Sequence, residues 1–350
     1  MEKINFDNTR FKNEMTLKTH GGILKTDRME RVNMKTKITK SQKARDFKGF
    51  CRRNNRQFYF WALAIIPILY VFLFNYCTKL GIIIAFKDYN YADGILGSKW
   101  VGFDNFKFFI TSGDFARVVK NTVLNNLVFI AVGMISAVVF ALLLYELTSR
   151  KATKVYQTTV MTPHFVSWII GSYIVYAFLN PQSGVVNALL TRMGIESVNW
   201  YANPKPWPII LTICFVWKNI GMDSILYYST LMSIDESLFE AAEVDGASRI
   251  QKTWYVTLPE LKNLICLLLV MKIGGIFSAD FGLFYQVPRN VGALYPTTDV
   301  ISTYVFRAMT EVKDFGMSTA VSFADSVVGF IMVYTTNMIM RKYNEESALF

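Results

Sequence analysis

The chain has 350 residues, of which 52% are hydrophobic and 15% aromatic, and its mean hydropathy is positive. This composition is more apolar than that of a typical soluble globular protein, so the first expectation is a membrane protein. The net charge of +11 does not indicate a nucleic-acid partner, because sixteen Lys and Arg against six Asp and Glu lie in residues 1–56 and the other 294 residues are nearly neutral.

Residues 1–56 lack the short apolar core and small-residue cleavage site of a secretory signal peptide. Their mix of Lys, Arg, Asn and Thr with few large apolar residues predicts a cytoplasmic arm that is disordered or bound to the membrane surface. The stretch 35–56 is basic enough to lie against anionic headgroups. Nucleic-acid binding is disfavoured because few aromatic residues are interleaved with the basic ones.

Long apolar runs follow the arm. A helix needs roughly 20 residues to cross a bilayer core, and this length identifies the candidate spans. The first run, 57–78, carries Pro67 in its middle, which is tolerated in membranes where neighbouring groups satisfy the freed carbonyl. Six spans are predicted: 57–78, 122–145, 160–179, 208–232, 263–281 and 316–340. The sequence therefore predicts an all-α membrane protein with a six-helix transmembrane domain at 57–343 and a short cytoplasmic tail at 344–350.

Two of the connecting segments have a recognisable character. Residues 87–121 are polar and aromatic, which predicts an ordered loop. Residues 180–207 are interrupted by several Pro and Gly, so they are predicted to form a loop with one short amphipathic helix at about 185–193.

A polar insert, residues 240–259, separates two long hydrophobic runs and is too polar to cross a membrane. Ser233 followed by Glu236 has the spacing of a capping box, which predicts the start of a helix. Asp245 and Gly246 predict a turn, because glycine adopts a positive φ at little steric cost. A second helical segment is predicted from Ala247 to the Leu258-Pro259 pair, where proline ends it. The insert is thus a helix-turn-helix elbow.

The elbow resembles the EAA loop of the membrane subunits of binding-protein-dependent ABC importers. The resemblance is carried by Glu240, Ala241, Ala242, Asp245, Gly246, Ala247, Val256, Leu258 and Pro259. It implies that residues 233–262, the coupling loop that contains the elbow, form coupling helices. Such helices bind in a cleft of an ATPase subunit, and closure of that subunit then moves the transmembrane helices. The family often has an aromatic residue where this chain has Thr253. The alternative, an amphipathic elbow lying on the bilayer, does not require the whole pattern.

The same resemblance implies a cargo and partners. Val101 to Phe106, VGFDNF, is similar to a stretch common among sugar-importer permeases, so an oligosaccharide cargo is expected. A second, homologous permease would complete the pathway as a heterodimer, two cytoplasmic ATPase subunits would drive it, and an extracytoplasmic solute-binding protein would deliver the sugar. An importer of another solute is the first alternative. A secondary transporter or channel that works without ATP is a different class, which the elbow disfavours.

The sequence contains no recognisable nucleotide-binding, metal-binding or catalytic motif. It lacks a Walker A loop with GK[ST], so ATP and Mg²⁺ are expected on the partner ATPase subunits, and the chain is not expected to be an enzyme. Its four cysteines lie far apart and it has only two histidines, so no metal site and no bound cofactor are predicted.

Orientation is predicted from the Lys and Arg residues of short segments near the membrane. The basic arm and the cluster at 150–154 favour the inside, which places both termini in the cytoplasm of a bacterial cell. Six spans in the cytoplasmic membrane then put the elbow on the side of ATP.

Four charged residues interrupt the predicted spans: Lys218, Asp223, Lys272 and Asp325. Charges at that depth are costly and usually face a partner or a wet cavity. Either Asp325 pairs with Lys218 or Lys272 to join helices, or at least one charge lies on the translocation path. Aromatic residues such as Trp217 and Tyr173 are further path candidates because sugar rings stack on them, although such residues also gather at bilayer interfaces.

Overall fold

The computed structural model describes residues 60–61 and 63–343, and the chain divides into two units, residues 1–80 and 81–350. The predicted arm and tail, 1–56 and 344–350, lie outside the described residues. A helical stretch runs over Leu63–Phe86 and includes η1 (Phe72–Tyr76) and η2 (Cys77–Phe86). It continues eight residues past the predicted end at 78, because the sequence beyond it is apolar apart from Lys79.

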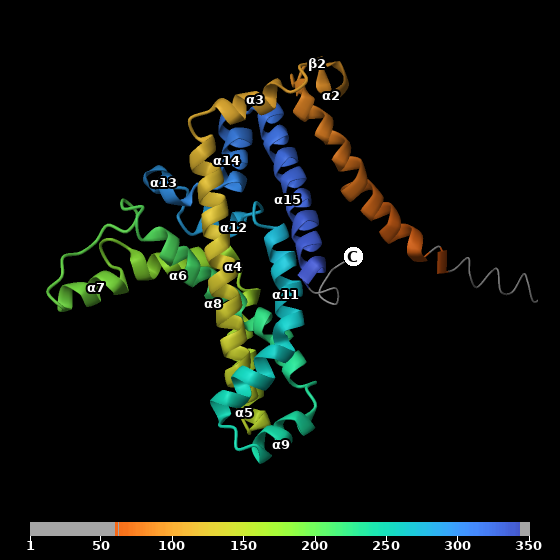
Figure 1. The fold of residues 1–350 in the computed structure, drawn as a ribbon. Helices are drawn as coiled ribbons and strands as arrows, with labels where there is room; N and C mark the ends of the chain where they lie inside the picture. The colour runs from red at the N-terminus through yellow and green to blue at the C-terminus, as the bar shows by residue number, and fades with distance from the viewer. Residues whose placement is uncertain (1–59, 62, 344–350) are drawn as a thin grey trace, which may run out of the picture. The chain divides into compact units, whose positions relative to one another are not determined.

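The second unit is mainly helical, with one antiparallel pair of two-residue strands (Figure 1). Its elements are β1 (Lys87–Asp88), α2 (Gly94–Gly97), β2 (Lys99–Trp100), α3 (Asp104–Thr111), α4 (Phe115–Tyr145), α5 (Arg150–Met161), η3 (Thr162–Phe165), α6 (Trp168–Leu179), α7 (Val185–Arg192), α8 (Trp207–Leu231), α9 (Glu236–Val244), α10 (Arg249–Lys252), η4 (Thr253–Thr257), α11 (Leu258–Gly274), α12 (Phe281–Gln286), η5 (Gly292–Leu294), α13 (Tyr295–Thr298), α14 (Ile301–Arg307), η6 (Ala308–Val312) and α15 (Phe315–Tyr343).

The fold class predicted from the sequence, an all-α membrane protein, is confirmed. Among the described residues, four helices are long and apolar enough to cross a membrane: Leu63–Phe86, Phe115–Tyr145, Trp207–Leu231 and Phe315–Lys342. The bent pair α5–η3 and α6 would make a fifth. The predicted span 263–281 corresponds largely to α11, whose 17 residues end at Gly274 rather than at 281.

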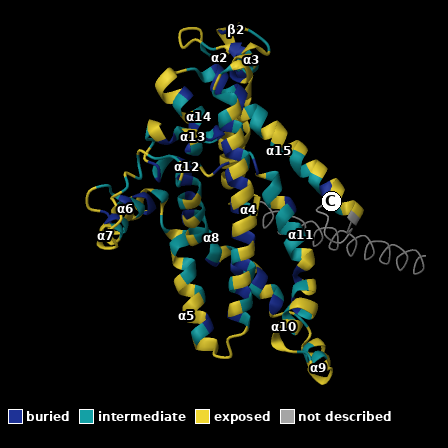
Figure 2. Cartoon of the chain, turned by 60° about the vertical axis from the view of Figure 1, so that its left-hand side comes forward, coloured by how far each residue is buried: buried dark blue, intermediate teal, exposed yellow. Residues whose placement is uncertain are grey.

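The long helices pack in pairs, α4 along α8 and α11 along α15. Ala137 and Ala141 of α4 are fully buried against Tyr227 and Leu231 of α8, since small side chains allow close approach of two helices in a membrane. Figure 2 shows many exposed residues along the same helices. The exposed side chains include large apolar ones, as expected where a helix meets lipid rather than water.

The predicted third span, 160–179, is not one straight helix. Its residues begin inside α5, and α6 then departs at an angle of 100°. Pro163 lacks a backbone N–H, Val166 is extended, and the Ser167 hydroxyl accepts a hydrogen bond from Ile170 N at 3.4 Å to start the new helix. These three residues break the helix at that point.

The VGFDNF stretch has a structural function at the end of the unit that carries β2 and α3. Phe103 and Phe106 pack on the ring of Phe86, which also contacts Phe323 of α15, with centroid distances of 5.4–5.9 Å. The Asn105 amide donates to two backbone carbonyls beside β1, at 2.9 and 3.0 Å. The stretch therefore ties Phe86, the last residue of η2, to the last helix.

Three buried asparagines of α4 support the irregular chain between α11 and α14. Asn126 donates to Ile276 O at 2.7 Å, Asn121 donates to carbonyls of Pro296 and Asp299, each at 3.1 Å, and Asn125 donates to a carbonyl in α13. Non-helical backbone is tolerated at membrane depth only where such groups satisfy it.

Candidate functional site

The first half of the elbow is α9, which begins at Glu236. Its N-cap is Asp235, whose carboxylate accepts a hydrogen bond from Ser237 N at 3.0 Å, and this bond lowers the pKa of Asp235. The predicted capping box that starts at Ser233 is wrong. The Ser233 hydroxyl instead donates to Thr230 O at 2.7 Å and so satisfies the end of the preceding helix α8.

The turn after α9 is the one that the sequence predicts. Gly246 has φ +75°, and Ala247 N donates to Ala242 O while Gly246 N donates to Glu243 O, at 2.9 and 3.0 Å. This is the Schellman arrangement, in which glycine in the left-handed conformation lets the last carbonyls of a helix be satisfied. The carbonyl of Ala242, within the EAA stretch, is thus part of the turn.

The second half of the elbow starts at Ser248, which forms a capping box with Gln251. From α10 the chain continues through the π-helical turn η4 directly into α11. The predicted end at Pro259 is wrong: Pro259 lies in the first turn of α11, where its missing N–H and fixed φ are compatible with helix. Movement of the elbow is therefore connected to α11 through continuous helical backbone.

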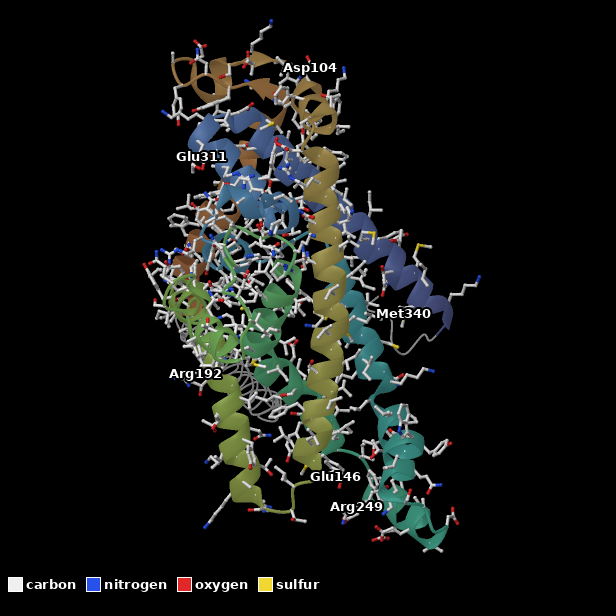
Figure 3. The ribbon with its side chains drawn as sticks, turned by 90° about the vertical axis from the view of Figure 1, so that its left-hand side faces the viewer. Asp104, Glu146, Arg192, Arg249, Glu311 and Met340 are labelled. Carbon is white, nitrogen blue, oxygen red and sulfur yellow. The ribbon has the colours of Figure 1, made fainter. Side chains whose placement is uncertain are left out.

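Two ion pairs involve residues of the elbow. Lys252 donates to Glu243 across the turn, and this hydrogen bond, together with the positive charge, lowers the pKa of Glu243. Arg249 lies 4.0 Å from Glu146, at the end of α4. Glu146 and Arg249 lie together at the end of the unit opposite Asp104 (Figure 3). The elbow thus lies at one end of the helical unit.

The elbow exposes apolar side chains in a segment that is otherwise polar. Val244, Ile250 and Tyr255 are 89%, 72% and 80% exposed. Among the residues that carry the resemblance, Glu240, Ala241, Asp245, Gly246 and Pro259 are exposed, and Ala242, Ala247, Val256 and Leu258 are half-buried. Sequence reasoning did not single out Val244, Ile250 and Tyr255, although apolar residues in a polar insert were a signal for a contact surface.

The charged residues in the predicted spans do not pair as the sequence suggested. Lys272 of α11 donates to Asp223 of α8, with 2.8 Å between Nζ and Oδ2. The interpretation that Asp325 pairs with Lys218 or Lys272 is wrong, because both lysines have other partners. Asp325 on α15 is half-buried, and its Oδ1 has no hydrogen-bond partner among the described residues.

Lys218 of α8 lies at the break between η3 and α6. Its ammonium donates to the backbone carbonyls of His164, at 3.1 Å, and of Val166. It also lies 5.1 Å from the centroid of Trp168, whose Nε1 donates to Asp280 Oδ2 at 2.7 Å. Lys218 thus donates hydrogen bonds to two backbone carbonyls at the break in the helix. Asp280, which sequence reasoning missed, joins α6 to the start of α12.

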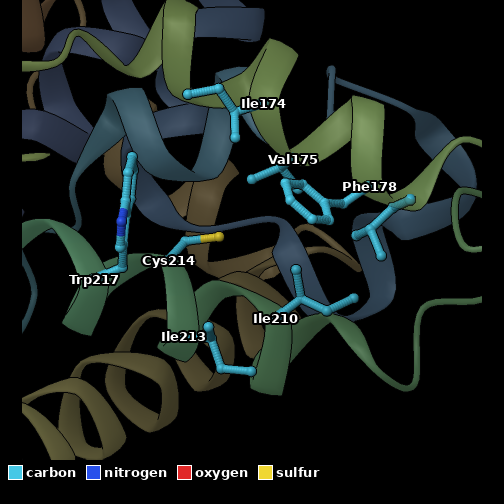
Figure 4. Close-up of a pocket in the computed structure, with 8 residues that line it drawn as sticks. Ile174, Val175, Phe178, Ile210, Ile213, Cys214 and Trp217 are labelled. Atoms are coloured by element: carbon cyan, nitrogen blue, oxygen red, sulfur yellow. The ribbon is translucent and has the colours of Figure 1, made fainter. Parts of the chain in front are cut away.

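The two aromatic candidates lie in different surroundings. Trp217 lines an apolar cleft of about 310 Å³ with Ile174, Phe178, Ile213 and Cys214 (Figure 4). That lining offers few groups for the hydroxyls of a sugar. Tyr173 is 62% exposed and lines a different pocket, which also contains Ser172, Gln286 and Arg289.

Comparison with known proteins identifies the family. A model described as "Binding-protein-dependent transport system inner membrane component" matches residues 129–344, which include the whole elbow. The chain belongs to this family. Its resemblance to ABC importer permeases, expected from the EAA residues, is therefore confirmed, and this inner membrane component is a membrane subunit of that class of transporter.

Individual relatives of this inner membrane component cover most of its length. Protein LplB of Bacillus subtilis (strain 168) is 32% identical over 285 residues, which are 81% of this chain and 89% of that protein. The polygalacturonan/rhamnogalacturonan transport system permease protein YteP of the same organism is 32% identical over 291 residues, 83% of this chain and 90% of that protein.

A solved structure agrees with the family assignment. The crystal structure of a bacterial ABC transporter involved in the import of the acidic polysaccharide alginate contains a chain that is 32% identical, with a TM-score of 0.75. The match covers 83% of this inner membrane component and 97% of that chain. The bent pair α5–α6 and the elbow both lie within the part that the family model matches.

Proposed function

We propose that this inner membrane component forms half of a pathway that imports an oligosaccharide, with a second homologous permease as the other half. Two cytoplasmic ATPase subunits bind ATP and Mg²⁺ and supply the energy, and an extracytoplasmic solute-binding protein delivers the sugar. The proposal is supported by relatives whose names refer to diacetylchitobiose, arabinooligosaccharides and polygalacturonan. The basic arm supports cytoplasmic termini in a bacterial membrane.

The observation that carries the coupling function is the exposed apolar surface of the elbow, formed by Val244, Ile250 and Tyr255. Exposed apolar side chains of this kind mark a site that binds another protein or a membrane surface, and the family favours a protein here. The elbow is held in one conformation by the Schellman turn at Gly246 and by the Glu243–Lys252 pair. A partner that moves it would therefore move α11, and an ATPase subunit is the partner that the family requires.

The candidates for the translocation path differ in what their side chains contact. Lys218, Asp223 and Lys272 contact groups of this chain, and their contacts connect α8 to the α5–α6 break and to α11. We assign these three to holding the helices around the path. Tyr173, which is exposed in a polar pocket, and Asp325, with an unsatisfied carboxylate oxygen, are the candidates for contact with sugar or with the second permease.

The proposal is tested by reconstituting the chain with its partner permease, ATPase subunits and binding protein in liposomes, and measuring uptake of labelled oligosaccharides. Uptake of at least one oligosaccharide is expected, with ATP required and no ion gradient needed. Uptake driven by an ion gradient in the absence of ATP would contradict it.

The coupling surface is tested by a matched pair of variants. Val244→Asp and Leu96→Asp both place a charge on a side chain that is 89% exposed, at opposite ends of the unit. Val244→Asp is expected to lower uptake and sugar-stimulated ATPase activity by about 10-fold, as loss of one important interface contact does. Leu96→Asp is expected to have little effect on ATPase coupling. Normal activity of an assembled Val244→Asp complex would exclude this surface as the docking site.

A further inference from the structure

The turn after α12 places an arginine in a defined position. Arg289 and Asn290 have φ +60° and +50°, a region that residues with side chains rarely adopt. The conformation is held by hydrogen bonds from Arg289 N to Gln286 O and from Asn290 N to Tyr285 O, at 3.1 and 3.2 Å. Asn290 Oδ1 also accepts from the Tyr295 hydroxyl at 3.0 Å. Unfavourable backbone that is held in this way occurs preferentially at functional sites.

The side chain of Arg289 lies against α6. The centre of its guanidinium is 4.3 Å from the ring centroid of Tyr176 and 5.7 Å from that of Tyr173, within the range of cation–π contacts. No ion pair between described residues includes Arg289, and no hydrogen bond from its guanidinium to a described residue is present. The two rings therefore orient a guanidinium whose N–H donors are available to a ligand.

A pocket of about 230 Å³ lies beside this arginine. Its polar and aromatic lining consists of Ser172, Tyr173, Tyr285, Gln286, Arg289 and Asn290. The volume is below the 300–1,000 Å³ typical of sites for whole drug-sized ligands, so it suits one ring of a longer chain. Hydroxyl and amide groups suit the hydroxyls of a sugar, and tyrosine rings suit its apolar face.

A neutral sugar does not require an arginine, whereas a carboxylate does match its planar fork of N–H donors. We infer that the pocket binds a uronate residue of an acidic oligosaccharide, with Arg289 donating to the carboxylate and Tyr173 contacting the ring. This inference rests on the proposed oligosaccharide import and specifies the class of sugar. The competing explanation is that Arg289 only clamps α6 to α12.

The test compares trigalacturonate with its methyl ester, which keeps the three rings and removes the charges. Binding of each to the purified transporter complex, without the binding protein, is measured by saturation-transfer NMR. The wild-type complex is expected to bind the acid roughly 10- to 100-fold more tightly than the ester, as a charge-assisted bidentate contact provides. In Arg289→Gln the two ligands should bind equally well.

Two further variants separate recognition from structure. Arg289→Lys keeps the positive charge beside the tyrosines but lacks the fork, so it should retain only part of the preference for the acid. Arg192→Gln removes an exposed arginine of α7 outside the pocket and should behave as wild type. Assembly of every complex is checked by size-exclusion chromatography and basal ATPase activity.

Several results would overturn the inference: equal binding of acid and ester to the wild type, a preference that survives Arg289→Gln, or no binding of trigalacturonate. Displacement of trigalacturonate by an equal concentration of inorganic phosphate would also overturn it, because the pocket would then be a general anion site. If the inference fails while the complex still imports a neutral oligosaccharide such as maltotriose, the proposed function stands. If no oligosaccharide is imported, the proposed function fails as well.

Discussion

Lys272 of α11 and Asp223 of α8 form an ion pair with 2.8 Å between Nζ and Oδ2. These two helices are the ones that enter and leave the elbow, so the pair joins them at some distance from the turn itself. We therefore expect a displacement of the elbow to reach both helices together rather than one alone. The pair is a mechanical element of the coupling that we propose.

Removal of one partner of this pair should destabilise the protein. Asp223→Asn or Lys272→Met is expected to lower stability by about 1–3 kcal/mol, because a partly buried charge loses its partner. The double swap Asp223→Lys with Lys272→Asp should recover much of the loss, and thermal unfolding of the purified complex measures it. Lys120→Met, at an exposed lysine, serves as the control. Additive single effects without recovery would mean that the pair contributes no coupling.

Substitutions at Gly246, in the turn of the elbow, should act only through the backbone conformation that each residue prefers. A Cβ at Gly246 would meet no atom within 4 Å, so only its φ of +75° limits substitution. Gly246→Val is expected to cost about 1 kcal/mol or more and to reduce sugar-stimulated ATPase activity, whereas Gly246→Asn should be tolerated because asparagine visits this conformation. Equal activity of the two variants would show that the turn geometry is not required.

Lys218 should stabilise the break in the predicted third span. Lys218→Met leaves the carbonyls of His164 and Val166 without their donor, so we expect a loss of about 2 kcal/mol, the value for a hydrogen bond from a charged group. Lys205→Met, at an exposed lysine, is the control. Thermal unfolding and hydrogen exchange of residues 162–172 measure the effect. Unchanged exchange there would indicate that water replaces the lysine at no cost.

The fully buried carboxylate of Asp299 should be among the most sensitive positions. It accepts from Arg307 at 2.8 Å and from Arg117 at 3.2 Å. Asp299→Asn keeps the shape but removes the counter-charge of the largely buried Arg307 and leaves Arg117 with Asp114 alone, which should cost about 3–5 kcal/mol. Asp104→Asn, in a pair whose side chains are largely exposed, should cost less than about 1 kcal/mol. Chemical unfolding of the two variants gives the comparison, and similar values would contradict the role assigned to burial.

The sequence by itself determined the features that depend on local chemistry. Apolar runs of sufficient length indicated the membrane helices, and α8 and α15 agree with their predicted spans within three residues at each end. A glycine after a helix predicted the Gly246 turn, because the left-handed conformation is a property of one residue. The EAA residues identified the family for a similar reason, since the elbow is a continuous segment.

Tertiary structure decided the features that depend on which groups meet. Ser233 was the predicted cap, but the end of α8 engages its hydroxyl and Asp235 caps α9 instead. Two lysines and two aspartates in the spans allowed several pairings, and helix packing selected Lys272 with Asp223. Arg289 reaches the rings of α6 from more than 100 residues away in the chain, so no local pattern predicts that contact. Such contacts depend on the relative positions of whole helices, which many distant packing interactions set together.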